Sequence, residues 1–157
     1  MKISVQQQDF DVSVETQQLC AGRLDIGAVA SFTGLVRDTS ADKNLLALEL
    51  EHYPGMTESA LQAIADQADE RWDIQDLTII HRVGRLAPAD NIVLVIVVSA
   101  HRKDAFEACE FLMDYLKTQA PFWKKEITRT GENWVESRHS DQQAALRWKD
   151  GSSSRSK

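Results

Sequence analysis

Cysteine is scarce in this chain, which has only Cys20 and Cys109 among its 157 residues. These two residues do not make a disulfide framework or a CxxC metal site, and Cys109 lies on an apolar stripe, as a small core residue would. The histidines follow neither the HxH nor the HExxH pattern, and the sequence has no GxGxxG or Walker-type glycine loop. We therefore expect no metal ion and no other bound cofactor.

Long apolar runs and an excess of positive charge are also missing. The apolar stretch 92–100 is far too short to span a membrane, and the amino terminus has no run of signal-peptide length. A formal net charge of -6 and a sequence pI near 5.2 argue against general nucleic-acid binding, which needs a basic face. We expect a cytoplasmic protein that binds neither membranes nor nucleic acids.

The length of the chain favours one domain. A chain of 157 residues with 43% hydrophobic content can bury one substantial core and is too short for two comfortable ones. No linker-like segment interrupts residues 1–149, which we expect to form a single domain. Residues 150–157 are small and polar, and they are expected to form a disordered tail.

Strand and helix signals follow one another along the domain. Residues 92–98 are apolar on both faces, which is typical of a central strand covered on each side. Further strands are predicted around residues 3–5, 27–34, 45–52, 77–83, 122–128 and 134–135, and helices around 17–19, 57–72 and 140–148. Residues 37–44 are polar and aperiodic, so a mobile loop is expected there. The order predicts an α+β fold with a mixed sheet.

One more helix, which must end before Pro121, carries the most informative pattern. Its apolar residues recur at helical spacing: Ala105, Phe106, Cys109, Leu112, Met113 and Leu116. Asp104 is the predicted cap. Lys117 lies at the edge of this stripe, so its stem can follow core side chains while its amine reaches a cavity at the helix end. Pro121 cannot continue the helix and biases Ala120 toward extended geometry.

The strand after Pro121 places a second lysine near the same corner. Alternation puts Phe122, Lys124 and Glu126 on one face, where Glu126 can pair with Lys124. Residues 115–129 hold four Lys/Arg and one acid within an acidic protein, which indicates a site for an anionic ligand. The alternative is structural, because lysines near a helix C-terminus favour its dipole and strand lysines usually face water.

Other polar residues are predicted around this corner. His101 and Arg102 lie where the buried strand meets the start of the helix, a position that suits a phosphate. Arg37 follows a strand and can act as a guanidinium clamp. The alternatives are that these residues pair with carbonyls or nearby carboxylates, or simply face solvent. His81 and His52 lie on apolar strand faces and are interpreted as core or interface residues.

Five motifs in series resemble the large, catalytic subunit of molybdopterin synthase. They are residues 32–37 (FTGLVR), 50–57 (LEHYPGMT), 81–84 (HRVG), 99–102 (SAHR) and 113–124 (MDYLKTQAPFWK). The resemblance runs from about residue 27 to residue 148, in family order and spacing. It implies an α/β-hammerhead type of α+β fold, with a mixed, largely antiparallel sheet flanked by helices.

The resemblance also implies an activity, which is sulfur transfer in molybdenum-cofactor biosynthesis. The family converts cyclic pyranopterin monophosphate into molybdopterin by installing two sulfurs as a dithiolene. The sulfur arrives as a thiocarboxylate on the C-terminal glycine of a small ubiquitin-like carrier subunit. In the family, two large subunits form a homodimer with one carrier at each end, so the whole assembly is a heterotetramer.

By resemblance, Lys117 is the leading catalytic residue and Lys124 assists it or positions substrate. The expected binding residues match family positions around the pterin, its phosphate and the carrier tail: Arg37, His101, Arg102, Arg138, Phe32 and Met113. Arg138 would be contributed across the dimer. Each lysine can act as an acid or base, as a covalent acceptor or as a charge that stabilises oxyanions, and the sequence does not choose among these roles.

Two other functions remain open at this point. The chain could be a non-catalytic docking module for a ubiquitin-like protein, in which case Lys117→Ala would leave function intact. It could also be a Schiff-base lyase for an anionic carbonyl compound, which borohydride trapping would detect. Neither alternative explains the series of five motifs.

Overall fold

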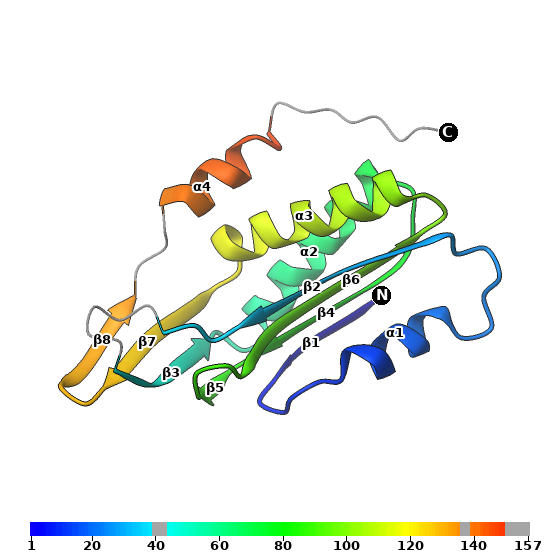
Figure 1. Cartoon of the computed structure of the whole chain (residues 1–157). Coiled ribbons are helices and arrows are strands. Elements are labelled where there is room, and N and C mark those ends of the chain that lie inside the picture. Colours follow the sequence, from blue (N-terminus) through cyan, green and yellow to red (C-terminus); the bar gives the residue numbers. More distant parts are fainter. Residues whose placement is uncertain (39–43, 136–138, 150–157) are drawn as a thin grey trace.

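The strands of the protein form two sheets that meet at one end of a helical layer. A computed structural model describes residues 1–38, 44–135 and 139–149. The larger part of the molecule is a four-stranded sheet with helices on both faces, and a second four-stranded sheet extends from its end (Figure 1). The α+β expectation with a mixed, largely antiparallel arrangement is confirmed.

The first sheet has the order β1 (Lys2–Gln6), β4 (Ile74–Arg82), β6 (Asn91–Ser99) and β2 (Ala28–Leu35). Only the β1–β4 pair is parallel. Helices α2 (Met56–Arg71) and α3 (Arg102–Gln119) cover one face, and α1 (Val12–Cys20) covers the other (Figure 1). Strand β6 is therefore buried on both sides, which confirms its prediction as a central strand.

The second sheet has the order β5 (Gly84–Leu86), β3 (Leu45–His52), β7 (Phe122–Thr128) and β8 (Gly131–Val135), and all its pairs are antiparallel. Leu48, Leu50 and Leu86 of this sheet belong to a smaller apolar cluster. The last helix, α4 (His139–Leu146), lies against α3. Beyond α4, Trp148 Nε1 donates a hydrogen bond of 2.6 Å to the Asp114 carboxylate of α3.

Helix α3 links the two sheets, and its ends are set by local sequence. Ala120 ends the helix with φ -79° and ψ 132°, the extended geometry predicted before Pro121, and β7 begins two residues later at Phe122. The predicted cap at Asp104 is wrong. His101 is the capping residue, and it makes no side-chain capping hydrogen bond. Asp104 lies within the first turn, where a carboxylate still interacts favourably with the helix dipole.

Other boundaries agree with prediction to different degrees. Strands β3 and β7 have the predicted bounds, whereas α1 is longer than the three residues expected and the short strand β5 was not predicted. Most of the predicted loop after Arg37 and the whole predicted tail lie outside the described residues. None of the helices in the described ranges is long and apolar enough to cross a membrane.

Candidate active site

A cavity of about 910 Å³ opens where α3 ends and the two sheets diverge. Its wall combines side chains from β2, β3, β7, the end of α3 and the turn before β6. Apolar residues such as Phe32, Leu48 and Phe122 supply much of the lining. A cavity of this size, with an apolar wall and a few polar groups, suits a small organic ligand.

Both predicted catalytic lysines line this cavity. Lys117 is exposed in the last turn of α3, and Lys124 is half-buried in the middle of β7. Phe122 and Glu126 share the cavity face with Lys124, as alternation along β7 predicts. Lys117 directly follows buried Leu116, so it lies at the end of the apolar stripe and at the cavity wall.

Two further predicted site residues, Arg37 and Phe32, also line the cavity from the end of β2 and the segment after it. The turn before β6 holds this segment, because Val36 N–H donates to Asp90 O and Ala89 N–H donates to Val36 O, both at 2.8 Å. These two backbone hydrogen bonds fix the chain immediately before Arg37, whose side chain is exposed.

Three predicted binding residues lie elsewhere. Met113 belongs to the main core at 8% exposure and does not line the cavity, because its face of α3 packs on the first sheet. His101 and Arg102 are exposed at the start of α3. Lys117 lies fifteen positions after Arg102 in the helix, a distance of about 22 Å along the axis. The prediction that they share a corner with the lysines is therefore wrong within one chain.

Arg138 lies outside the described residues, so its predicted role stays a prediction. The expected basic character of the corner also needs correction. Lys125 does not line the cavity and instead pairs with Glu49 at 3.7 Å and Glu132 at 3.3 Å. The charged residues in the described cavity wall are balanced in sign: Arg37, Lys117 and Lys124 against Asp38, Glu126 and Asp141.

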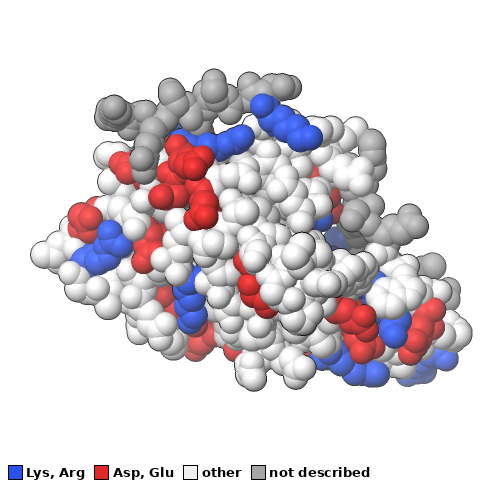
Figure 2. Space-filling model, turned by 180° about the vertical axis from the view of Figure 1, so that it is seen from behind, with Lys and Arg blue, Asp and Glu red and all other residues white. Residues whose placement is uncertain are grey.

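The described cavity wall therefore carries no net formal charge, and any attraction for an anion would come from the local positions of its cations. Figure 2 shows the same mixture on the face turned away from the view of Figure 1, where basic and acidic groups are interleaved and much of the surface is uncharged. Within the described residues, no group of three or more His, Cys, Asp or Glu side chains is arranged to hold a metal ion.

His81 is a cavity residue that the sequence did not identify as part of a site. It is 4% exposed, and its ring stacks on Phe122 with centroids 3.7 Å apart. Burial lowers the pKa of His81 to about 3, and the nearby positive charges of Lys124 and Lys117 add to this effect. The sequence placed His81 on the same strand face as Ile79, but no pattern in the neighbouring residues indicated that the second sheet would cover it.

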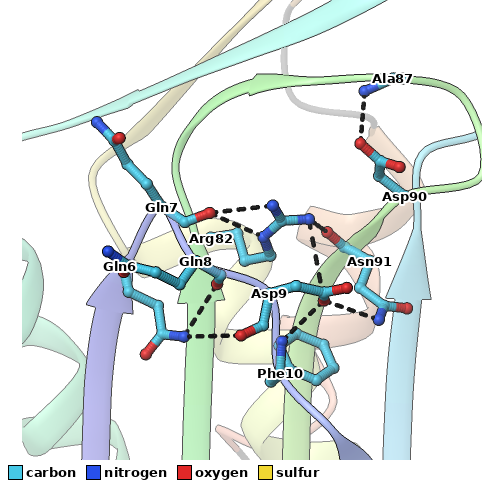
Figure 3. A network of polar contacts seen from close by, with 9 residues as sticks. All are labelled: Gln6, Gln7, Gln8, Asp9, Phe10, Arg82, Ala87, Asp90 and Asn91. Carbon is cyan, nitrogen blue, oxygen red and sulfur yellow. Dashed lines mark hydrogen bonds and ion pairs between the residues drawn. The ribbon is translucent and has the colours of Figure 1, made fainter.

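A polar network fixes the end of β4 directly after His81 (Figure 3). The Arg82 guanidinium donates to Gln7 O at 3.0 and 3.1 Å and to Asn91 O at 2.9 Å. The Asn91 amide donates to Asp9 at 2.9 Å, and this hydrogen bond is the main reason that the pKa of Asp9 is lowered. The network ties together the ends of β1, β4 and β6 beside the cavity.

The family model described as MoaE protein matches residues 5–119 of this chain. The chain belongs to the MoaE family. A MoaE relative from Ralstonia nicotianae, named molybdopterin synthase catalytic subunit, is 58% identical over 146 residues, which are 93% of this chain and 83% of the relative. The resemblance seen in the five motifs is therefore confirmed.

Solved structures agree with this assignment. The MoaE protein from Burkholderia ambifaria MC40-6 is 54% identical, with a TM-score of 0.81 over 96% of this chain and 99% of that one. A complex of subunits 1 and 2 of molybdopterin-converting factor from Helicobacter pylori contains a chain with 21% identity and a TM-score of 0.73, over 87% of this chain and 91% of that one. At that identity the second likeness shows the shared MoaE fold alone.

Proposed function

We propose that this chain is the catalytic subunit of a molybdopterin synthase, which transfers sulfur from a thiocarboxylated carrier subunit to cyclic pyranopterin monophosphate. The observation that carries the proposal is the meeting of Lys117 and Lys124 at one cavity in a chain that belongs to the MoaE family. The lysines come from a helix and a strand, so the fold, and not the sequence spacing alone, brings them together.

The chemistry needs cations near two anions, the thiocarboxylate and the substrate phosphate. Release of an acyl group from sulfur passes through a tetrahedral oxyanion, which a lysine ammonium at the cavity can stabilise. Arg37 presents a planar guanidinium that matches a phosphate or carboxylate with two parallel hydrogen bonds. The apolar wall at Phe32 and Phe122 suits the flat pterin ring.

The carrier is a partner that must deliver a thin, extended tail to the cavity. In Helicobacter pylori, a chain with this fold occurs in a complex of subunits 1 and 2 of molybdopterin-converting factor, and we propose a comparable assembly for this chain. We also propose a homodimer. His101 and Arg102 lie about 22 Å from Lys117 along α3, so in one chain they cannot contact a small ligand held by that lysine. A second copy could bring them to the same ligand.

The test is reconstitution with a thiocarboxylated carrier and cyclic pyranopterin monophosphate, with the dithiolene product detected after oxidation to its fluorescent derivative. We expect Lys117→Ala to abolish turnover and Lys124→Ala to reduce it severely. Lys103→Ala is the matched control for Lys117, because it is exposed on the same helix about 21 Å away. Lys125→Ala is the control for Lys124, because it lies next to it and does not line the cavity.

Equal activity in all four variants would contradict the site. Absence of product from the wild-type protein, with carrier binding intact, would favour the docking-module alternative. Covalent trapping by borohydride in the presence of substrate, without dithiolene formation, would favour a Schiff-base lyase.

A further inference from the structure

His81 joins the two sheets at the wall of the cavity. It belongs to β4 in the first sheet, whereas Phe122, on which it stacks with an interplanar angle of 17°, belongs to β7 in the second. The imidazole therefore has one face against an aromatic ring, and both rings line the cavity that also contains Lys117 and Lys124.

The hydrogen bond that His81 makes fixes its tautomer. Its Nδ1 lies 2.8 Å from the carbonyl oxygen of Arg82, and a carbonyl oxygen can only accept. Nδ1 therefore carries the hydrogen and Nε2 carries a lone pair. That carbonyl is held in place, because the Arg82 side chain is itself anchored to Gln7 and Asn91 (Figure 3).

The lone pair of Nε2 is available to a ligand. No described residue forms a hydrogen bond with Nε2. Nε2 is also not one of the fully buried nitrogen and oxygen atoms without a partner, so it has accessible surface. It must therefore reach the open space of the cavity, which His81 lines. With a pKa of about 3, the ring stays neutral at physiological pH, so it is a poor general base and a constant hydrogen-bond acceptor.

We propose that Nε2 of His81 accepts a hydrogen bond from a ring N–H of the bound pterin, which makes His81 a substrate-binding residue of the site. This inference rests on the proposed function. The cations of the cavity can hold the anionic groups of the substrate, but an ammonium or guanidinium cannot accept a hydrogen bond from a ring N–H. A neutral acceptor of fixed orientation supplies the complementary group and selects heterocycles that carry a donor there.

The first test compares the kinetics of wild type with His81→Phe, which keeps a flat ring beside Phe122 and removes the acceptor. We expect the KM for cyclic pyranopterin monophosphate to rise roughly tenfold, since a ligand donor would lose its partner, while kcat stays within about twofold. His81→Gln, whose amide oxygen can accept, should recover most of the wild-type KM. The Kd for the carrier should be unchanged in both variants.

The second test keeps the wild-type protein and changes the ligand. Pterins methylated at single ring nitrogens are compared with the unmethylated pterin as competitive inhibitors. Methylation of the ring nitrogen whose N–H donates to His81 should weaken inhibition of wild type roughly tenfold. The same methylation should have little effect on His81→Phe, because the N–H and the imidazole act as one coupled pair. This comparison decides the matter even if His81→Phe does not fold, because every methylated pterin inhibiting wild type equally would overturn the proposal.

The outcomes separate this inference from the function on which it rests. A wild-type protein that makes no dithiolene contradicts the proposed function itself. A wild type that turns over, with His81→Phe showing the same KM, contradicts only the role of His81. If KM, kcat and carrier Kd all worsen and His81→Gln recovers none of them, His81 is a structural residue and the proposal is wrong.

Discussion

Acidification from pH 7 to pH 5 should destabilise this protein through His81. The folded state holds the imidazole buried and neutral, with its pKa lowered from 6.5 to about 3, whereas the unfolded chain exposes it to water. As the pH falls below 6.5, the unfolded state binds a proton that the folded state does not. The stability contributed by neutral His81 is thus fully present above pH 6.5 and is lost as the pH falls toward 3.

The size of the effect follows from these two pKa values. At pH 5 the unfolded imidazole is almost fully protonated, and its protonation favours unfolding by about 2 kcal/mol relative to pH 7. Other shifted groups titrate outside this interval, because the pKa of Asp9 is lowered from 3.8 and burial raises the pKa of the Cys109 thiol to about 11. The loss is a large fraction of the stability of a typical domain, about 5–15 kcal/mol.

The assay is urea unfolding followed by tryptophan fluorescence at pH 7 and pH 5. With a typical slope of about 2 kcal/mol per molar urea, the midpoint should fall by about 1 M in wild type. His81→Phe cannot bind the proton in either state, so its midpoint should shift much less. His101→Gln is the matched control, because it removes an exposed histidine and should keep the wild-type shift.

A wild-type protein whose unfolding free energy is the same at both pH values would refute the reasoning, as would an equal loss in His81→Phe. The first result would mean that the ring is hydrated or able to take up a proton in the folded state. The second would place the pH dependence on other groups.

Two stability effects should be separable from activity. Phe111 is fully buried and makes edge contacts with Trp72 and Trp148, so Phe111→Ala should cost about 3–5 kcal/mol in urea unfolding, and a loss below about 1 kcal/mol would contradict this packing. Asp114→Ala removes the acceptor for Trp148 Nε1 and should cost about 1–2 kcal/mol while turnover is retained, with Glu110→Ala, at an exposed position, as the weaker control.

The elements with strong local signals could be predicted from sequence. The start of β7 follows from Pro121, which ends α3 and biases the chain toward extended geometry. Strand β6 was recognised because no polar residue interrupts residues 92–98. In both cases the decisive information lies within about ten residues, which is the range over which backbone preference and periodicity act.

The division into two sheets could not be predicted in the same way. Strand pairing joins β3 to β7, about seventy-five residues apart in the chain, and its register places Leu50 opposite Lys124. Such pairings depend on the packing of distant segments, and the periodicity of one strand does not report them. The three-residue strand β5 likewise exists only because β3 lies beside it.

The site was predicted in part for the same reason. Lys117, Lys124, Arg37 and Phe32 meet at the cavity, and the motifs had grouped them. His101 was grouped with them as well, although helix geometry alone places it at the far end of α3. Alternation placed Glu126 on the Lys124 face, whereas Asp38 and Asp141 were not predicted at the site, because they come from segments that only the fold brings near the lysines.

Two buried contacts determine where Lys124 lies. Thr57, which is fully buried at the start of α2, donates from its hydroxyl to Tyr53 O at 3.0 Å and lies within 3.2 Å of Pro121 O. The His81–Phe122 stack holds the next residue after Pro121 against the first sheet. The start of β7 is therefore attached both to helix α2 and to the first sheet. Lys124 lies two residues after Phe122. The lysine on the second sheet can keep a constant relation to the lysine on α3 because these contacts leave the sheets little freedom to move apart at the cavity.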